Sequence, residues 1–324
     1  MRESIFNIQT EQEFLDLALT IFRHQFNNNS VYRSFCDLLY VHPSDVKELE
    51  QIPFLPIQFF KTKEVLSTQN AVQEIFTSSG TTGSVTSKHF VTDLSLYEES
   101  YLRGFRSFYG DIEDYTVLAL LPNYLEREGS SLVYMVNDFI LKSNKSESGF
   151  YLNNLHELAS MLERLDAAGK KILLIGVSFA LLDIIERYQL RLKNTIVMET
   201  GGMKGMRKEL VREELHHLLG EGFGVSQIHS EYGMTELLSQ AYAIRDGRFG
   251  CPAWMKVLAR DTEDSLSILP RGVSGGINII DLANYNSCSF IATEDLGKVH
   301  ADGTFEIIGR FDNSDIRGCN LMVL

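Results

Sequence analysis

The alternation of helix-like and strand-like segments between residues 95 and 228 most constrains the fold of this chain. Long amphipathic segments are separated by short apolar runs, a pattern typical of a parallel-rich sheet covered by helices. We therefore predict an α/β fold. The predicted helices span 95–108, 130–141, 155–168, 179–192 and 208–219, and the predicted strands span 116–121, 172–177, 195–199 and 225–228.

The two ends of the chain differ in composition. None of the 24 glycines lies in the first 79 residues, and 16 follow residue 200. A capping box at Thr10 and Glu13 predicts a helix over 11–26, and a second helix is expected after Ser30. Near the other end, strand-like runs occur at 255–259, 276–280, 289–293 and 304–308. We predict a helix-rich N-terminal region and α/β core over 1–244 and a small β-rich subdomain over 245–324, joined by a packing seam.

Composition and charge exclude several classes of protein. The 324 residues are 44% hydrophobic, enough for a large core, and 30 Lys and Arg against 43 Asp and Glu give a net charge of −13. This charge opposes the approach of nucleic acids and anionic membranes. The longest apolar stretch, 172–185, is too short for a spanning helix, and the four cysteines form no CxxC pair. We expect a cytoplasmic protein without a nucleic-acid partner or stable membrane insertion.

A hydroxyl-rich loop lies between two strand-like runs, at 74–76 and 88–92. Its backbone N–H groups and hydroxyls are suited to binding a phosphate chain, and Lys88 lies five residues beyond Gly83, the last residue of the loop. The spacing does not match a Walker A loop. A plain connecting loop is the alternative. The loop residues are Thr77, Ser78, Ser79, Gly80, Thr81, Thr82 and Gly83.

A second motif follows the predicted strand 225–228, which places it at the carboxyl end of the sheet, where ligands of open α/β sheets bind. The ring of Tyr232 could stack on a base, and Thr235 and Glu236 offer the oxygen ligands that Mg²⁺ prefers. The alternative is a turn that caps a helix starting at Leu237. The motif consists of Tyr232, Gly233, Met234, Thr235 and Glu236.

Five motifs together resemble those of the AMP-forming adenylating enzymes, the acyl-CoA synthetase and phenylacetate-CoA ligase group. They occur in the order TSSGTTG, ETGG, YGMTE, TEDLG and GR, the last at 309–310. More narrowly, METGGMKG, YGMTELLSQAY, FIATEDLG and GRFDNSDIRGCNL resemble the LuxE-type acyl-protein synthetases, from about residue 50 to the end. The resemblance implies the large-domain fold of the adenylating enzymes, with helix-covered sheets.

The resemblance also implies a role for each motif. The hydroxyl-rich loop and Lys88 would hold the phosphates of ATP, and the 232–236 motif would contact the nucleotide. A carboxylate must attack the α-phosphorus of ATP, so positioning and charge stabilisation dominate this chemistry. The remaining implied roles belong to Gly201, Gly202 and Tyr232 at the adenine, Glu236 at Mg²⁺, Asp295 at the ribose and Arg310 at the nucleotide.

The end of the chain departs from the larger adenylating enzymes. It stops fifteen residues after Gly309 and has no lysine after Lys298, so we expect their mobile C-terminal lid domain and its catalytic lysine to be absent. In the LuxE-type family a cysteine near the C-terminus accepts the acyl group, and Cys319 matches it. Arg317 would favour its thiolate form. A buried, structural Cys319 is the alternative.

We therefore expect ATP-dependent activation of a carboxylic acid, preferably a fatty acid, as an acyl-adenylate, followed by acyl transfer to Cys319. The catalytic residues would be Lys88, Glu236 and Cys319. An AMP-forming acyl-CoA or aryl-CoA ligase is the alternative enzyme, and a non-catalytic nucleotide-binding partner or regulatory protein is the alternative of another class. The expected partners are the carboxylate substrate and either an acyl-accepting reductase or CoA. His89 and His229 lie beside the motifs and are predicted to be structural.

Overall fold

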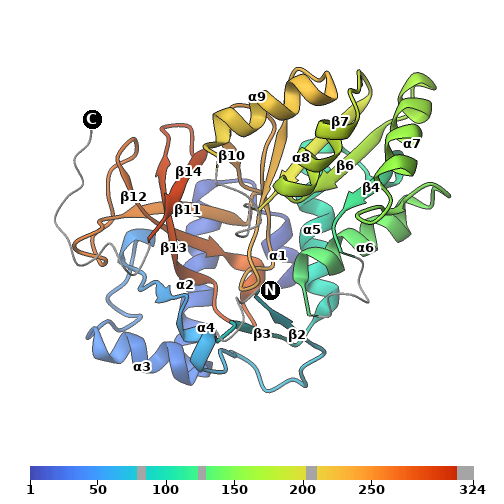
Figure 1. Cartoon of the computed structure of the whole chain (residues 1–324). Coiled ribbons are helices and arrows are strands. Elements are labelled where there is room, and N and C mark those ends of the chain that lie inside the picture. Colours follow the sequence, from blue (N-terminus) through green and yellow to red (C-terminus); the bar gives the residue numbers. More distant parts are fainter. Residues whose placement is uncertain (79–84, 123–128, 202–209, 312–324) are drawn as a thin grey trace.

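A computed structural model describes residues 1–78, 85–122, 129–201 and 210–311 of the chain (Figure 1). Twelve of its strands form one sheet, in the order β11-β12-β13-β14-β10-β9-β8-β7-β6-β4-β5, with β1 beside β13. Strands β2 and β3 form a separate hairpin. The main sheet has a parallel half and an antiparallel half, which meet where β8 pairs with β9. The predicted α/β fold is confirmed.

The parallel half matches the predicted alternation. All five residues of β4 and of β6 are buried, because helices cover both faces of these strands, and this explains their continuous apolar runs. Figure 1 shows α5 and α6 on one side and α8 and α9 on the other. The strands are β4 (Thr116–Leu120), β5 (Gly149–Phe150), β6 (Ile172–Gly176), β7 (Thr195–Thr200) and β8 (His229–Tyr232). The helices are α5 (Leu94–Tyr109), α6 (Ser131–Ser143), α7 (Leu155–Ala167), α8 (Ser178–Arg187) and α9 (Arg212–Phe223), with a 3₁₀ turn, η2 (Ile112–Asp114), after α5.

The prediction of a strand over 225–228 is wrong in position, because the strand found there, β8, begins four residues later, at His229. Gly224, with φ of +69°, ends helix α9, and the segment after it turns back so that the Val225 N–H donates to the Gly220 carbonyl. β8 itself has a polar sequence, yet Ser230 and Glu231 are buried. Apolar patterning therefore did not reveal it. The YGMTE motif begins inside this strand, at its last residue.

The antiparallel half contains the strands predicted near the C-terminal end, with one difference. Strand β13 has ten residues and extends beyond the predicted run 289–293, so Asp295 lies within the strand and pairs with Arg310 of β14. The predicted division at residues 244 and 245 stays a prediction. The strands are β9 (Ala241–Ala243), β10 (Phe249–Gly250), β11 (Met255–Arg260), β12 (Ser274–Asp281), β13 (Phe290–Val299) and β14 (Phe305–Arg310), and a 3₁₀ turn, η4 (Leu282–Asn284), follows β12.

The N-terminal helices pack against the antiparallel half. The predicted capping box is present, with the Glu13 N–H donating to Thr10 Oγ1 at 3.2 Å and the Thr10 N–H donating to Glu13 Oε2 at 3.1 Å. Phe22 packs edge-on against Phe290 of β13, with 6.2 Å between ring centres. The elements are α1 (Arg2–Phe6), α2 (Glu11–Asn28), α3 (Ser30–Leu38), η1 (Leu49–Gln51), β1 (Leu55–Pro56), α4 (Phe59–Thr62), β2 (Glu74–Thr77) and β3 (Lys88–Val91).

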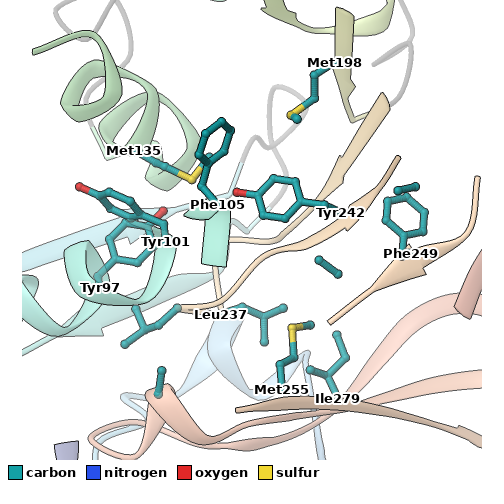
Figure 2. Close-up of a cluster of buried hydrophobic side chains, with 14 of the residues drawn as sticks. Tyr97, Tyr101, Phe105, Met135, Met198, Leu237, Tyr242, Phe249, Met255 and Ile279 are labelled. Atoms are coloured by element: carbon teal, nitrogen blue, oxygen red, sulfur yellow. The ribbon is translucent and has the colours of Figure 1, made fainter. Parts of the chain in front are cut away.

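The hydrophobic core continues across both halves of the sheet. Figure 2 shows aromatic side chains of α5 and Met135 of α6 beside Tyr242 of β9, with Met255 and Ile279 of the antiparallel half nearby. The rings of Phe105 and Tyr242 meet edge to face at 6.2 Å. Across the described ranges, we find no helix with the length and apolar character needed to cross a bilayer.

Candidate active site

The base of the β2–β3 hairpin carries the first group of predicted residues. Thr77 pairs with Lys88 in the hairpin register, and its N–H donates to the Gly129 carbonyl at 2.7 Å. The hairpin is closed by Ser78 and Ser87, since the Ser87 N–H donates to Ser78 Oγ at 2.9 Å. Lys88 is exposed. The predicted loop residues Ser79, Gly80, Thr81, Thr82 and Gly83 lie outside the described residues.

Glu236 lies where this hairpin meets the main sheet. Its side chain is only 4% exposed and is hydrogen-bonded to the side chain of Ser87. Burial raises the pKa of the Glu236 carboxyl, while the hydrogen bond and the positive charges of Arg310 and Lys61 oppose that shift. The carboxylate therefore faces hydroxyl and cationic groups from three other parts of the chain.

The side chains of Tyr232 on β8, Asp295 on β13 and Arg310 on β14 come together. The Tyr232 hydroxyl donates to Asp295 Oδ2 at 2.7 Å, and Arg310 Nε lies 3.1 Å from Asp295 Oδ1. Asp295 is buried, whereas the Arg310 side chain is 69% exposed. The ring of Tyr232 packs against Phe249 and Phe305. Three residues predicted from separate motifs are thus in direct contact.

The connection from β8 to β9 carries the rest of the YGMTE motif. A Cβ on Gly233 would lie 2.6 Å from Glu231 Oε1, so a larger residue there would displace the Glu231 carboxyl group. Met234 and Thr235 are half-buried, and the Leu237 N–H donates to the Met234 carbonyl at 3.1 Å to form a turn. The alternative of a helix starting at Leu237 is wrong, since the next element is β9.

Gly201 follows β7 on the parallel side of the site. Its φ is +71°, and its carbonyl accepts a hydrogen bond from Ser178 Oγ at 2.7 Å. The β7–β8 register pairs Thr200 with Glu231, which brings Gly201 to the same end of the sheet as Tyr232. The predicted adenine neighbour Gly202 lies outside the described residues.

His89 is a structural histidine, as predicted, but it contacts the motif directly. Its ring is 1% exposed, with Nδ1 2.8 Å from the Thr235 carbonyl oxygen and Nε2 3.1 Å from Asn284 Oδ1. Burial lowers its pKa to about 4. His229 lies elsewhere, with Nδ1 3.2 Å from the Tyr109 hydroxyl, and burial likewise lowers its pKa to about 4.

Sequence reasoning missed several polar residues that surround the motif. Asn284 Nδ2 donates to the Glu236 carbonyl at 2.8 Å, and Asp281 accepts hydrogen bonds from the Leu238 and Ser239 N–H groups. One signal was available, because Asp281 and Asn284 come directly after the apolar strand run 276–280, where polar residues of a site gather. The missed neighbours are Lys61, Ser87, Asp281 and Asn284.

The predicted acyl acceptor Cys319 lies outside the described residues. The other three cysteines, Cys36, Cys251 and Cys288, are free thiols. Burial raises the pKa of each of these thiols to about 12. At neutral pH they carry almost no thiolate, the reactive form of cysteine.

Comparison with known families shows to which protein family this chain belongs. The family model described as acyl-protein synthetase, LuxE, matches residues 6–100 and 128–324. The chain belongs to this family. This acyl-protein synthetase is a ligase-type enzyme, which activates a carboxylic acid with ATP and transfers the acyl group to protein.

Individual relatives agree with the family. The acyl-protein synthetase is 29% identical to the long-chain-fatty-acid–luciferin-component ligase of Vibrio harveyi, over 93% of this chain and 84% of that protein. Among solved structures, a 2-hydroxyisobutyryl-CoA ligase in the postadenylation state is 12% identical with a TM-score of 0.67, covering 94% of this chain and 68% of its own. ATP-bound MatB from Rhodopseudomonas palustris is 17% identical with a TM-score of 0.56, covering 75% of this chain. This chain spans 49% of the MatB chain, and at these identities the two structures show the fold.

Proposed function

We propose that this acyl-protein synthetase activates a long-chain fatty acid as its acyl-adenylate and then carries the acyl group on Cys319. The observation that carries the proposal is the contact of Tyr232, Asp295 and Arg310 beside Glu236 and the hairpin. The name of the Vibrio harveyi relative supports the chain length of the acid.

The nucleotide would lie over the carboxyl ends of β7 and β8. Asp295 keeps lone pairs that can accept hydrogen bonds from the two ribose hydroxyls, because each of its oxygens has one protein partner. Gly201, Gly202 and Tyr232 would border the adenine, and the largely exposed Arg310 can reach the nucleotide. The hydroxyl-rich loop 77–83 and Lys88 would hold the phosphates.

Glu236 fits a role as magnesium ligand. Its carboxylate stands beside the Ser87 hydroxyl, and Mg²⁺ binds through one or two carboxylates together with substrate phosphates. Lys61 and Arg310 favour the ionised form that a metal ligand needs. Bound Mg²⁺ supplies charge neutralisation at the phosphates.

In the first step, an oxygen of the substrate carboxylate attacks the α-phosphorus of ATP, and the bond from that phosphorus to the pyrophosphate oxygen breaks. Both reactants are anions, so the site must hold them in line and offset their repulsion. Lys88 and Arg310 supply positive charge, and the loop supplies N–H and hydroxyl donors. The products are the acyl-adenylate and pyrophosphate.

In the second step, the Cys319 sulfur attacks the acyl carbonyl carbon and AMP leaves, which yields a thioester. The high pKa of Cys36, Cys251 and Cys288 supports this assignment, since none of these thiols is poised as a nucleophile. An acyl-accepting reductase or CoA would take the group onward, and the luciferin component in the relative's name favours a protein. We place the enzyme in the cytoplasm, where ATP is supplied.

The test is the intact mass of the protein after incubation with Mg²⁺, ATP and a series of fatty and aryl acids. We expect one hydroxylamine-labile acyl adduct on the wild type and on the matched control Cys251→Ser, and none on Cys319→Ser. ATP–pyrophosphate exchange should persist in Cys319→Ser, because adenylation precedes transfer. An adduct that survives in Cys319→Ser would overturn the acceptor, and absence of exchange in the wild type would overturn the activation step.

A further inference from the structure

Two buried side chains from distant elements hold the backbone that carries Thr235 and Glu236. His89 lies on β3, and Asn284 is the last residue of η4; each is 1% exposed. His89 Nδ1 lies 2.8 Å from the Thr235 carbonyl oxygen, and Asn284 Nδ2 donates to the Glu236 carbonyl at 2.8 Å. Two consecutive carbonyls of the motif are therefore bound by side chains.

The protons in this cluster can be assigned from its chemistry. Asn284 Nδ2 also donates to the Cys288 carbonyl at 2.9 Å, and two carbonyl partners fix the amide with its Oδ1 toward His89. A backbone carbonyl can only accept, so His89 must donate to Thr235 from Nδ1. With this proton on Nδ1 of a neutral ring, Nε2 has none to donate, so its 3.1 Å contact with Asn284 Oδ1 is not a hydrogen bond.

His89 also ties the motif to the hairpin. Neighbouring residues of a strand point to opposite faces, and accordingly Lys88 is exposed while His89 is buried. Phe60 of α4 packs edge-on against the imidazole, with 5.9 Å between ring centres. Ser87, two residues before His89, is the hydrogen-bond partner of the Glu236 side chain. Strand β3, which begins at Lys88 directly after Ser87, is thus joined by His89 to the turn that presents Glu236.

We propose that His89 is a positioning residue for adenylation. It holds the Thr235 carbonyl and thereby keeps the Glu236 carboxylate in a fixed position relative to Ser87 and Lys88. The inference rests on the proposed role of Glu236 as magnesium ligand. Groups that orient a metal ligand typically change metal affinity or activity by about 10–100-fold when removed. His89 acts in the same way, through the peptide next to the ligand.

The test compares three substitutions that separate the two ring nitrogens. His89→Asn places an amide nitrogen near the position of Nδ1, His89→Gln places one near Nε2, and His89→Ala removes both. Binding of α,β-methylene-ATP is measured by calorimetry with Mg²⁺ and again with EDTA. We expect His89→Ala and His89→Gln to weaken binding in Mg²⁺ by about 10–100-fold. Binding in EDTA should be nearly unchanged, and His89→Asn should stay close to the wild type.

A matched control separates positioning from general destabilisation. In Tyr32→Phe another buried donor to a backbone carbonyl is lost, the Tyr32 hydroxyl on Pro53 at 2.6 Å, far from the motif in sequence. This variant should lower the melting temperature and keep the affinity in Mg²⁺. Equal losses in Mg²⁺ and EDTA, or an Asn variant as weak as the Ala variant, would overturn the inference. If His89→Ala fails to fold, the similar-sized Asn and Gln variants still decide it. A wild type that binds the nucleotide equally with and without Mg²⁺ contradicts the proposed role of Glu236 as magnesium ligand, whereas loss of ATP–pyrophosphate exchange would contradict the proposed function itself.

Discussion

At the scale of single residues, Glu231 shows how burial changes proton affinity beside the site. Its Oε2 accepts a hydrogen bond from Thr200 Oγ1 at 2.7 Å, yet burial, with a smaller contribution from the charge of Glu199, raises its pKa to about 7. Between pH 4.5 and 7 the Glu231 carboxyl is then protonated in the folded protein and ionised in the unfolded chain. The contribution of Glu231 to the free energy of unfolding must therefore fall as pH rises through this window.

We predict that Glu231→Gln removes this contribution, so that the free energy of unfolding falls less, or rises more, with increasing pH than in the wild type. A pKa raised from 4.5 to about 7 corresponds to a loss of up to about 3 kcal/mol in the wild type as pH rises through that window. Urea denaturation at pH 5, 6, 7 and 8 measures the slope, and Glu163→Gln, a change at an exposed position on α7, should keep the wild-type slope. A Glu231→Gln variant with the same slope as the wild type would show that Glu231 is already ionised at low pH.

At the scale of elements, Asp281 joins the end of β12 to the β8–β9 connection. Its side chain accepts hydrogen bonds from the N–H groups of Leu238 and Ser239 at 2.8 and 2.9 Å and from the Ser239 hydroxyl at 2.6 Å. It is fully buried. The connection that carries the YGMTE motif is consequently fixed to the antiparallel half as well as to the hairpin.

We predict that Asp281→Ala lowers the free energy of unfolding by about 3 kcal/mol or more, because three buried N–H groups, of Leu238, Ser239 and Ala283, and the Ser239 hydroxyl lose their acceptor. Asp302→Ala is the matched control, since Asp302 accepts the N–H and hydroxyl of Thr304 in an exposed turn. That variant should change stability by less than about 1 kcal/mol, because water replaces the lost partner. Equal effects of the two substitutions in urea denaturation would contradict the argument.

The same elements explain what could be predicted from the sequence. Strands β4 and β6 were recognised because both of their faces are buried, which makes them apolar throughout. Strand β8 was missed because its polar residues are satisfied by partners such as Thr200, which only the fold brings near. The motif residues were recognisable from local sequence. Their supports, His89 and Asn284, are 146 and 48 residues away from the carbonyls they contact, so local sequence did not show which groups these side chains bind.

At the scale of the whole molecule, the two regions predicted over 1–244 and 245–324 contact each other through paired strands and side chains. Two strands of the first region pair with strands of the second, since β9 pairs with β10 and β1 pairs with β13. Helix α2, near the N-terminus, also contacts the region after residue 244. Gln25 of α2 is fully buried, donates from Nε2 to the carbonyls of Asn284 and Tyr285, and accepts the Ser289 N–H at 3.0 Å. These contacts make separate unfolding of the two regions unfavourable.

We predict one cooperative unfolding transition, which Gln25→Leu moves to lower temperature without splitting it. The substitution leaves the Tyr285 carbonyl and the Ser289 N–H without their side-chain partner, at about 1–3 kcal/mol for each unsatisfied group, whereas the Asn284 carbonyl keeps the Ser287 N–H. Trp254 is the single tryptophan and is buried in the antiparallel half, so its fluorescence reports on that region. Far-UV circular dichroism reports mainly on the helices. The two melting curves should coincide in both proteins, whereas separate curves would mean that residues 245–324 unfold as an independent unit.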